Sequence, residues 1–211
     1  QVGRFDHETD MPADKIRIAL NHYMTEDVRI RCAQLVKDGP DGFDPRGDAS
    51  ARTYVYTFND AQSAPALNRK YVTHVRKQLD ADVMNTACQS LVGSHDFAAF
   101  AGPSTPADAP TRRVVESATA IRTGDNIEFK ITATAYLHQQ IRRIAGVLYD
   151  VGRGNSSHEL VGQLLASAER GAASHVMPAT GLCLESINYD GSGECGLPTI
   201  STTDSPDLSV N

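Results

Sequence analysis

The sequence lacks tryptophan, an excess of positive charge and any long apolar run. Its 20 Lys and Arg are outnumbered by 26 Asp and Glu, which gives a formal net charge of −6. Because no overall positive charge attracts a polyanion, a nucleic-acid surface would have to come from local clusters of cations. No apolar stretch approaches the roughly 18 residues that span a bilayer. We therefore expect a globular protein with no membrane partner.

Cysteine patterns and targeting segments are also scarce. The four cysteines form no C-x-x-C pair and have no adjacent histidine pair, so a structural zinc site has little support. We expect reduced, mostly packed thiols. The sequence shows no signal peptide and no initiator methionine, and Gln1 to Phe5 alternates like the end of a strand. These features favour an intracellular protein, in an unspecified compartment, and a truncated or processed product.

Two kinds of hydrophobic periodicity alternate along the chain. Apolar residues at helical spacing predict helices at 12–23, 80–91, 137–151 and, after a Ser156 to Glu159 capping box, 160–165. Residues that alternate along a strand predict further elements at 28–32, 51–58 and 182–189. The clearest β signal is a hairpin: a strand through Val115, Ser117, Thr119 and Ile121, a turn at 123–126, and a strand at 127–135.

This order of elements predicts an α+β fold, with a mixed, mainly antiparallel sheet and helices on one face. A chain of 211 residues can bury one sizeable core, or two small lobes that share a continuous sheet. We expect one folded region over residues 1–189. Residues 190–211 are rich in Gly, Ser, Thr, Asp and Pro and carry scattered apolar residues, which predicts a flexible tail.

Three places combine cations with aromatic or apolar residues: Arg46 with Arg52 and Tyr54, the pair Arg112–Arg113, and His138 with Arg142–Arg143. Each place also has an ordinary structural explanation. A tyrosine on an alternating strand commonly packs in a core or an interface. Adjacent arginines in a helix fit a solvated face, and a histidine near a helix start fits a capping or packing role. Composition and periodicity alone therefore lead only to an α+β domain.

Four segments carry recognisable motifs, and they occur in order. They are Phe43–Arg46 followed by the R-x-Y-x-Y run Arg52–Tyr56, then Gly93–Phe100, Ala135–Gly146 and Ala179–Leu184. The second segment has the form G-x-H-D-F-x-x-F, the third A-Y-x-H-x-x-I-R-x-I-x-G, and the fourth A-x-G-L-x-L. Together they resemble the tRNA pseudouridine synthase A family, from Gln1 to about Tyr189. The resemblance implies that residues 1–189 form a catalytic region with the pseudouridine synthase fold, incomplete at its N-terminus.

The resemblance also implies an activity and roles for individual residues. Members of the family isomerise uridine to pseudouridine in the anticodon arm of tRNA, commonly as homodimers, with no metal and no organic cofactor. Tyr54 and Leu182 match the positions that sandwich the base, and Arg142 matches the arginine that pairs with the catalytic aspartate. Weaker candidates for contacts with the RNA are Arg46, Arg52, Arg112, Arg113, His138 and Arg143.

One family motif is absent. The motif G-R-T-D-x-G-V-H, which carries the catalytic aspartate, does not occur in the sequence, and neither Asp6 nor Asp125 lies in a matching context. We therefore assign the nucleophile to no residue of this chain and expect it upstream of Gln1, so that the 211 residues alone would be inactive. The alternative is a non-catalytic RNA-binding module that kept the fold and lost the carboxylate.

Overall fold

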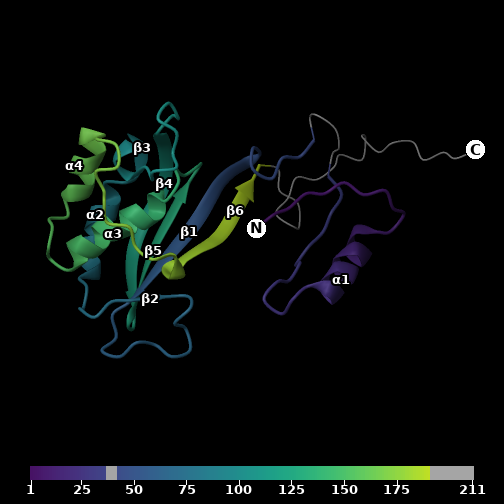
Figure 1. Cartoon of the computed structure of the whole chain (residues 1–211), viewed down its shortest axis with the longest axis horizontal. Coiled ribbons are helices and arrows are strands. Elements are labelled where there is room, and N and C mark those ends of the chain that lie inside the picture. Colours follow the sequence, from purple (N-terminus) through teal and green to yellow (C-terminus); the bar gives the residue numbers. More distant parts are fainter. Residues whose placement is uncertain (37–41, 191–211) are drawn as a thin grey trace, which may run out of the picture. The chain divides into compact units, whose positions relative to one another are not determined.

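A computed structural model describes residues 1–36 and 42–190 (Figure 1). Contacts divide the chain into two compact units, one formed by Gln1–Ser50 with Asn188–Asn211 and the other by Ala51–Ile187. Nearly all of the expected sheet belongs to the second unit. The single region expected over residues 1–189 stays a prediction, and the tail expected from residue 190 lies, beyond Asp190, outside the described residues.

The first unit contains the helix α1, Ala13–Tyr23, at the place that the sequence predicts. The strand predicted at 28–32 is wrong, because this segment has no regular structure. The side-chain amide of Asn21 forms hydrogen bonds with both polar backbone groups of Ile30. Its Nδ2 donates to the carbonyl and its Oδ1 accepts from the N–H, each at 2.8 Å. A side chain thus satisfies the backbone groups that a neighbouring strand would otherwise pair.

The second unit is built around a mixed sheet. Its strands are β1 (Ala49–Asn59), β2 (Thr73–His74), β3 (Gly93–Asp96), β4 (Arg112–Thr123), β5 (Asn126–Ala133) and β6 (Leu182–Tyr189). The order is β2-β1-β5-β4-β3, and β6 also pairs with β1. The β1–β2 pair is parallel, whereas the β1–β5, β4–β5 and β3–β4 pairs are antiparallel. The predicted mixed, mainly antiparallel sheet is therefore confirmed.

The predicted hairpin is the β4–β5 pair, which turns at Gly124 with a left-handed φ of 58°. Its second strand alternates as expected, with the apolar side chains buried. The first strand does not, because a bulge between Val115 and Ser117 shifts the register. After the bulge Ala118 is buried, while Ile121 is 59% exposed. An extra residue in one strand moves every later side chain to the other face, and this cannot be read from alternation alone.

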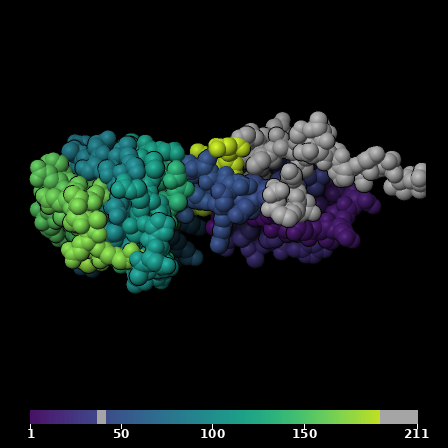
Figure 2. Space-filling view, turned by 90° about the horizontal axis from the view of Figure 1, so that it is seen from above, coloured from purple at the N-terminus to yellow at the C-terminus, as the bar shows by residue number. Residues whose placement is uncertain are grey.

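The helices α2 (Ala81–Gln89), α3 (Gln140–Gly152) and α4 (Leu160–Ser167) cover the sheet on one side (Figure 1). Their apolar side chains and those of the strands form one buried cluster, centred on residues such as Met84, Phe129 and Leu148. In the space-filling view the green residues around α4 lie directly against the teal residues of the sheet region (Figure 2). Burial of this common face supplies the main driving force for folding of the second unit.

The ends of the helices confirm one predicted cap and correct another. The carboxylate of Asp80 accepts from the N–H groups of Asp82 (3.1 Å) and Val83 (3.0 Å), as expected for an N-cap. The capping box predicted from Ser156 to Glu159 is wrong. The N–H of Glu159 instead donates a hydrogen bond to the hydroxyl of Ser157 at 3.3 Å, and no side chain caps α4.

The cysteines also depart from expectation. Cys32 is disulfide-bonded, so the prediction of reduced thiols is wrong there. Cys88 and Cys183 are free, but only Cys88 is buried, and burial raises the pKa of its thiol to about 12. Cys195 lies outside the described residues.

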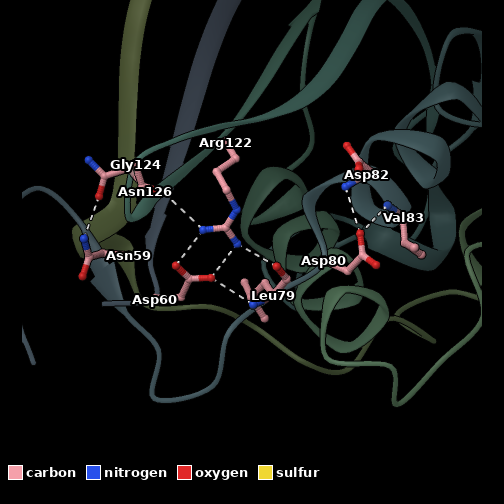
Figure 3. Close-up of polar contacts among 9 residues, drawn as sticks. All are labelled: Asn59, Asp60, Leu79, Asp80, Asp82, Val83, Arg122, Gly124 and Asn126. Atoms are coloured by element: carbon pink, nitrogen blue, oxygen red, sulfur yellow. Dashed lines mark hydrogen bonds and ion pairs between the residues drawn. The ribbon is translucent and has the colours of Figure 1, made fainter. Parts of the chain in front are cut away.

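An ion pair between Asp60 and Arg122 joins three elements of the second unit (Figure 3). Asp60 follows β1 and has a side chain only 3% exposed, and Arg122 lies near the end of β4. The two guanidinium nitrogens contact the two carboxylate oxygens at 2.9 and 2.7 Å. The N–H of Leu79, just before α2, donates to Asp60 at 2.9 Å, and its carbonyl accepts from Arg122 at 2.7 Å. The pair therefore fixes where the chain enters α2.

Hydrogen bonds from Arg122 hold the pKa of Asp60 below its ordinary value. Because the folded pKa lies below the unfolded pKa, the stabilisation is complete above the ordinary carboxyl pKa of about 4 and is lost as the pH falls through the folded value.

We predict that Asp60→Ala lowers the free energy of unfolding by about 3 kcal/mol at pH 7, because it leaves the guanidinium of Arg122 without its carboxylate. Urea denaturation measures this change. The matched control is Asp14→Ala, which removes an exposed i,i+3 partner of Arg17 and should cost less than about 1 kcal/mol. The difference between wild type and Asp60→Ala should narrow below about pH 4. Equal effects of the two variants at pH 7 would refute this role.

Candidate active site

Tyr54 lies on β1, partly buried against the core cluster. Its ring meets the ring of Tyr136 edge-on, with the centroids 5.2 Å apart. The Tyr136 hydroxyl lies 3.0 Å from the carbonyl of Arg52 on β1 and 2.9 Å from that of Ile131 on β5, so it is held to both strands. The R-x-Y-x-Y strand and the motif that opens α3 therefore meet at Tyr54, and Tyr136 fixes the orientation of its ring.

Tyr56 lies two residues further along the same face of β1 and is fully buried. Its hydroxyl is 2.6 Å from the Thr73 hydroxyl on β2 and donates to the carbonyl of Pro178 at 2.9 Å. Burial raises the pKa of Tyr56, and hydrogen bonding to Thr73 and the nearby charge of Arg142 oppose this rise. The net effect keeps the phenol neutral. Sequence reasoning did not assign Tyr56 to the site, although it is the second tyrosine of the R-x-Y-x-Y run.

Arg142 lies in the first turn of α3 and forms two hydrogen bonds with Met177. Its Nε donates to the Met177 carbonyl at 2.6 Å, and the Met177 N–H donates to the Arg142 carbonyl at 3.1 Å. Within residues 1–36 and 42–190 no carboxylate forms an ion pair with Arg142. Because Pro178 follows Met177 and accepts from Tyr56, Arg142 and Tyr56 are anchored to adjacent residues of one segment.

Leu182 begins β6 directly after the short 3₁₀ helix η2, Ala179–Gly181, and packs against the same cluster as Tyr54. Gly181 makes this approach possible. A Cβ at this position would lie 2.8 Å from the Thr57 carbonyl, 2.8 Å from the Thr73 hydroxyl and 2.9 Å from Cζ of Tyr56. Only glycine fits without displacement, and its close approach brings the start of β6 against β1.

The motif Gly93–Phe100 is mainly structural. Phe97 and Phe100 are fully buried. The N–H of Gly102, just after the motif, donates to the carbonyl of His138 at 2.9 Å. His138 therefore uses its backbone to hold this loop against the start of α3, while its side chain is exposed.

Three of the arginines proposed to contact RNA hold backbone carbonyls of the protein. Arg52 donates to Thr134, and Arg143 donates to Ala173, both at 2.7 Å. Arg113 donates to the carbonyls of Pro110 at 2.9 Å and Arg112 at 2.7 Å. These contacts support a structural role, which the sequence could not distinguish from an RNA contact.

Arg46 and Arg112 are exposed. Arg46 belongs to the first unit, where its N–H donates to the carboxylate of Asp44 at 2.9 Å. Arg112 lies directly opposite Asp96 in the register of the antiparallel β3–β4 pair. A hydrogen bond from Thr111 is the main cause that holds the pKa of Asp96 below its ordinary value, and the charge of Arg112 adds to it.

Comparison with known proteins identifies the family. A family model described as tRNA pseudouridine synthase matches residues 87–190. The chain is 37% identical over 194 residues to tRNA pseudouridine synthase A of Caulobacter sp. (strain K31), which covers 92% of this chain and 76% of that protein. It is 33% identical over 188 residues to tRNA pseudouridine synthase A 2 of Clostridium perfringens, covering 89% and 75%. The chain belongs to the tRNA pseudouridine synthase family.

The family predicted from the four motifs is thus confirmed. A third relative, tRNA pseudouridine synthase A of Brucella ovis, is 35% identical over 190 residues, covering 90% of this chain and 75% of that protein. In this pseudouridine synthase chain the elements that carry Tyr54, Arg142 and Leu182 meet around the buried hydroxyl of Tyr56. The R-x-Y-x-Y strand, the start of α3 and the closing strand therefore form one candidate site rather than three.

No group of three or more His, Cys, Asp and Glu in residues 1–36 and 42–190 could hold a metal ion. In the same ranges, every helix is too short or too polar to pass through a membrane.

We predict that Gly181→Ala destabilises the protein by about 1–3 kcal/mol, because the added methyl must displace Thr73 or Tyr56 in a packed environment. The control is Gly162→Ala in α4, where the nearest neighbour of an added Cβ is the Ser90 hydroxyl at an ordinary 3.7 Å. That variant should be neutral or stabilising, since alanine favours a helix over glycine. Urea denaturation compares the two. Equal stability of both variants would show that Gly181 is not a packing constraint.

Proposed function

We propose that this protein isomerises uridine to pseudouridine in the anticodon arm of tRNA. The observation that carries the proposal is the convergence of three motif-bearing elements on one buried point, the Tyr56 hydroxyl, in a chain that belongs to the tRNA pseudouridine synthase family. The relatives are named as enzymes, which does not favour a non-catalytic RNA-binding module.

The reaction sets demands that this site is suited to meet. The bond between ribose carbon 1′ and base nitrogen 1 breaks, the base turns, and a bond from carbon 1′ to carbon 5 forms. Carbon 5 loses its proton and nitrogen 1 gains one, so there is no net redox and no cofactor is required. The target base must leave its stack, which costs a few kcal/mol, and needs an aromatic or apolar face in return. Tyr54 and Leu182 supply such faces from neighbouring strands.

Arg142 is proposed to orient the reacting carboxylate. Its Nε is fixed by the carbonyl of Met177, so the two terminal nitrogens of the guanidinium are held in a defined plane. A guanidinium keeps a nearby carboxylate ionised and binds it through two parallel hydrogen bonds. We propose that this carboxylate belongs to the family's first motif, which the 211 residues do not contain. Tyr56 is a positioning residue, because it acts through Pro178 on the segment that holds Arg142.

The remaining expectations are part of the same proposal. Arg46 and Arg112 are the exposed arginines among the candidates for backbone phosphate contacts. Arg52, Arg113, His138 and Arg143 would contribute mainly by shaping the surface, since the hydrogen bonds described above join them to the protein's own backbone. Assembly as a homodimer on one tRNA and an intracellular location complete the proposed function.

The function is tested with the whole gene product and a tRNA transcript that carries tritium at carbon 5 of uridine. Conversion to pseudouridine releases that tritium to water, and nucleoside analysis of fragments locates the modified position. We expect release that matches pseudouridine formed in the anticodon arm. No release from any tRNA would contradict the proposal.

In the same assay we predict that Tyr54→Phe retains tRNA binding and part of the activity, whereas Tyr54→Ala loses at least tenfold more. The phenylalanine ring preserves the stacking face and the contact with Tyr136, and alanine removes both. Urea denaturation of both variants checks that the loss in Tyr54→Ala is not caused by unfolding. Equal loss of activity in the two variants would assign the role to the hydroxyl and refute stacking.

A further inference from the structure

A surface hollow of about 450 Å³ lies next to the candidate active site. Its walls come from residues 73–77 at β2, from two residues at the end of α3 and just after it, and from a segment before β6. The lining residues outside 73–77 are Tyr149, Arg153, His175, Met177 and Pro178. Three of its lining residues are permanent cations, Arg76, Lys77 and Arg153, and none is an aspartate or glutamate. None of these residues lies in one of the four sequence motifs.

The sequence around β2 is basic within an acidic protein. Residues 61–79 contain four Lys and Arg and no Asp or Glu, although the chain carries a net charge of −6. Arg76 and Lys77 are exposed. Lys77 donates to the carbonyl of Arg153 at 3.2 Å, which keeps its charge at the rim of the hollow. In the described part of the chain Arg76 has no hydrogen bond or ion pair. Clustered cations of this kind produce a local positive potential despite the overall charge.

The side chain of Arg153 is held in place at the hollow by Tyr149. The guanidinium lies over the tyrosine ring, 5.3 Å from its centroid, and one nitrogen donates to the hydroxyl at 3.1 Å. Its Nε is buried with no partner in the described structure. The carboxylate of Asp150 lies 3.0 Å from Nδ1 of His175, a residue that lines the hollow. The hollow therefore presents the positive charge of an arginine whose side chain is held in place.

The hollow and the active site share a wall. Met177 and Pro178 line the hollow, and their carbonyls accept the hydrogen bonds from Arg142 and Tyr56. A group bound in the hollow would thus sit one layer of backbone away from the residues proposed to act on the base.

We propose that this hollow binds backbone phosphates of the tRNA strand that carries the target uridine. The inference rests on the proposed function and adds to it a phosphate site formed by Arg76, Lys77 and Arg153. Such a site holds the RNA without reading its sequence and fixes the strand while the base is extruded. The exposed ring of Tyr71, on the same basic segment, offers a surface on which an unpaired base can stack.

The test uses two variants of the whole gene product. One is a double variant that combines Arg76→Gln and Lys77→Gln, and the other is the single variant Lys130→Gln. Lys130 is an exposed cation on β5 and is already paired with Glu185, so it serves as the matched control. Filter binding of tRNA is measured across a salt series, and urea denaturation confirms that each variant is folded. Because each phosphate contact contributes about 0.7–0.9 to the slope of log K against log salt, the double variant should flatten the slope by about 1.5 and the control should not.

An unchanged slope in the folded double variant would overturn the phosphate site. So would a flattened slope in Lys130→Gln that equals that of the double variant, because the effect would then be general. Titration with inorganic phosphate at constant ionic strength distinguishes a site for free phosphate from a site for the tRNA backbone. The proposal would also be overturned if the double variant abolished binding of free phosphate but left the slope for tRNA unchanged. The tritium release of the wild-type protein tests the proposed function independently of these results.

Discussion

A buried phenol hydroxyl requires hydrogen-bond partners, and the partners of the Tyr56 hydroxyl lie on two other segments of the chain. Leaving such a group unpaired costs about 1–3 kcal/mol. Thr73 on β2 and the carbonyl of Pro178 satisfy it, so β1, β2 and the segment before β6 are held at one point. Gly181 allows the same segment to approach within contact of the tyrosine ring. The geometry of the candidate site follows from this one constraint.

The hydrogen bonding of the buried Tyr56 hydroxyl also explains how the side chain of Arg142 is oriented. Met177 precedes Pro178 and exchanges two hydrogen bonds with Arg142, so the guanidinium and the buried phenol are set by neighbouring residues. Pre-organised charges are effective in catalysis because they need not reorganise when the reaction occurs. The cationic hollow is lined in part by this same segment, through Met177 and Pro178. Binding of RNA phosphate and orientation of the catalytic carboxylate can therefore depend on one short stretch of backbone.

The sequence predicted the elements whose signals are local. The cap at Asp80, the second strand of the hairpin and the helix that carries Arg142 are specified by neighbouring residues, and they occur as expected. Two of the failures have non-local causes. The bulge after Val115 reverses the faces of β4, and the backbone of Ile30 is satisfied by a side chain nine residues away. Tyr56 and the basic hollow depend on contacts between distant segments, although the acid-free stretch at 61–79 could have been noticed in the sequence.

The central claim is that Arg142 acts on the chemistry rather than on tRNA affinity, and Arg142→Lys in the whole gene product tests it most directly. Lysine keeps the positive charge but cannot bind a carboxylate through a rigid fork while donating to Met177. With tRNA affinity and single-turnover pseudouridine formation measured on the same folded variant, the account predicts affinity within about threefold of wild type and a rate reduced at least a hundredfold. A rate close to that of wild type, or a loss of rate fully matched by a loss of affinity, would contradict it.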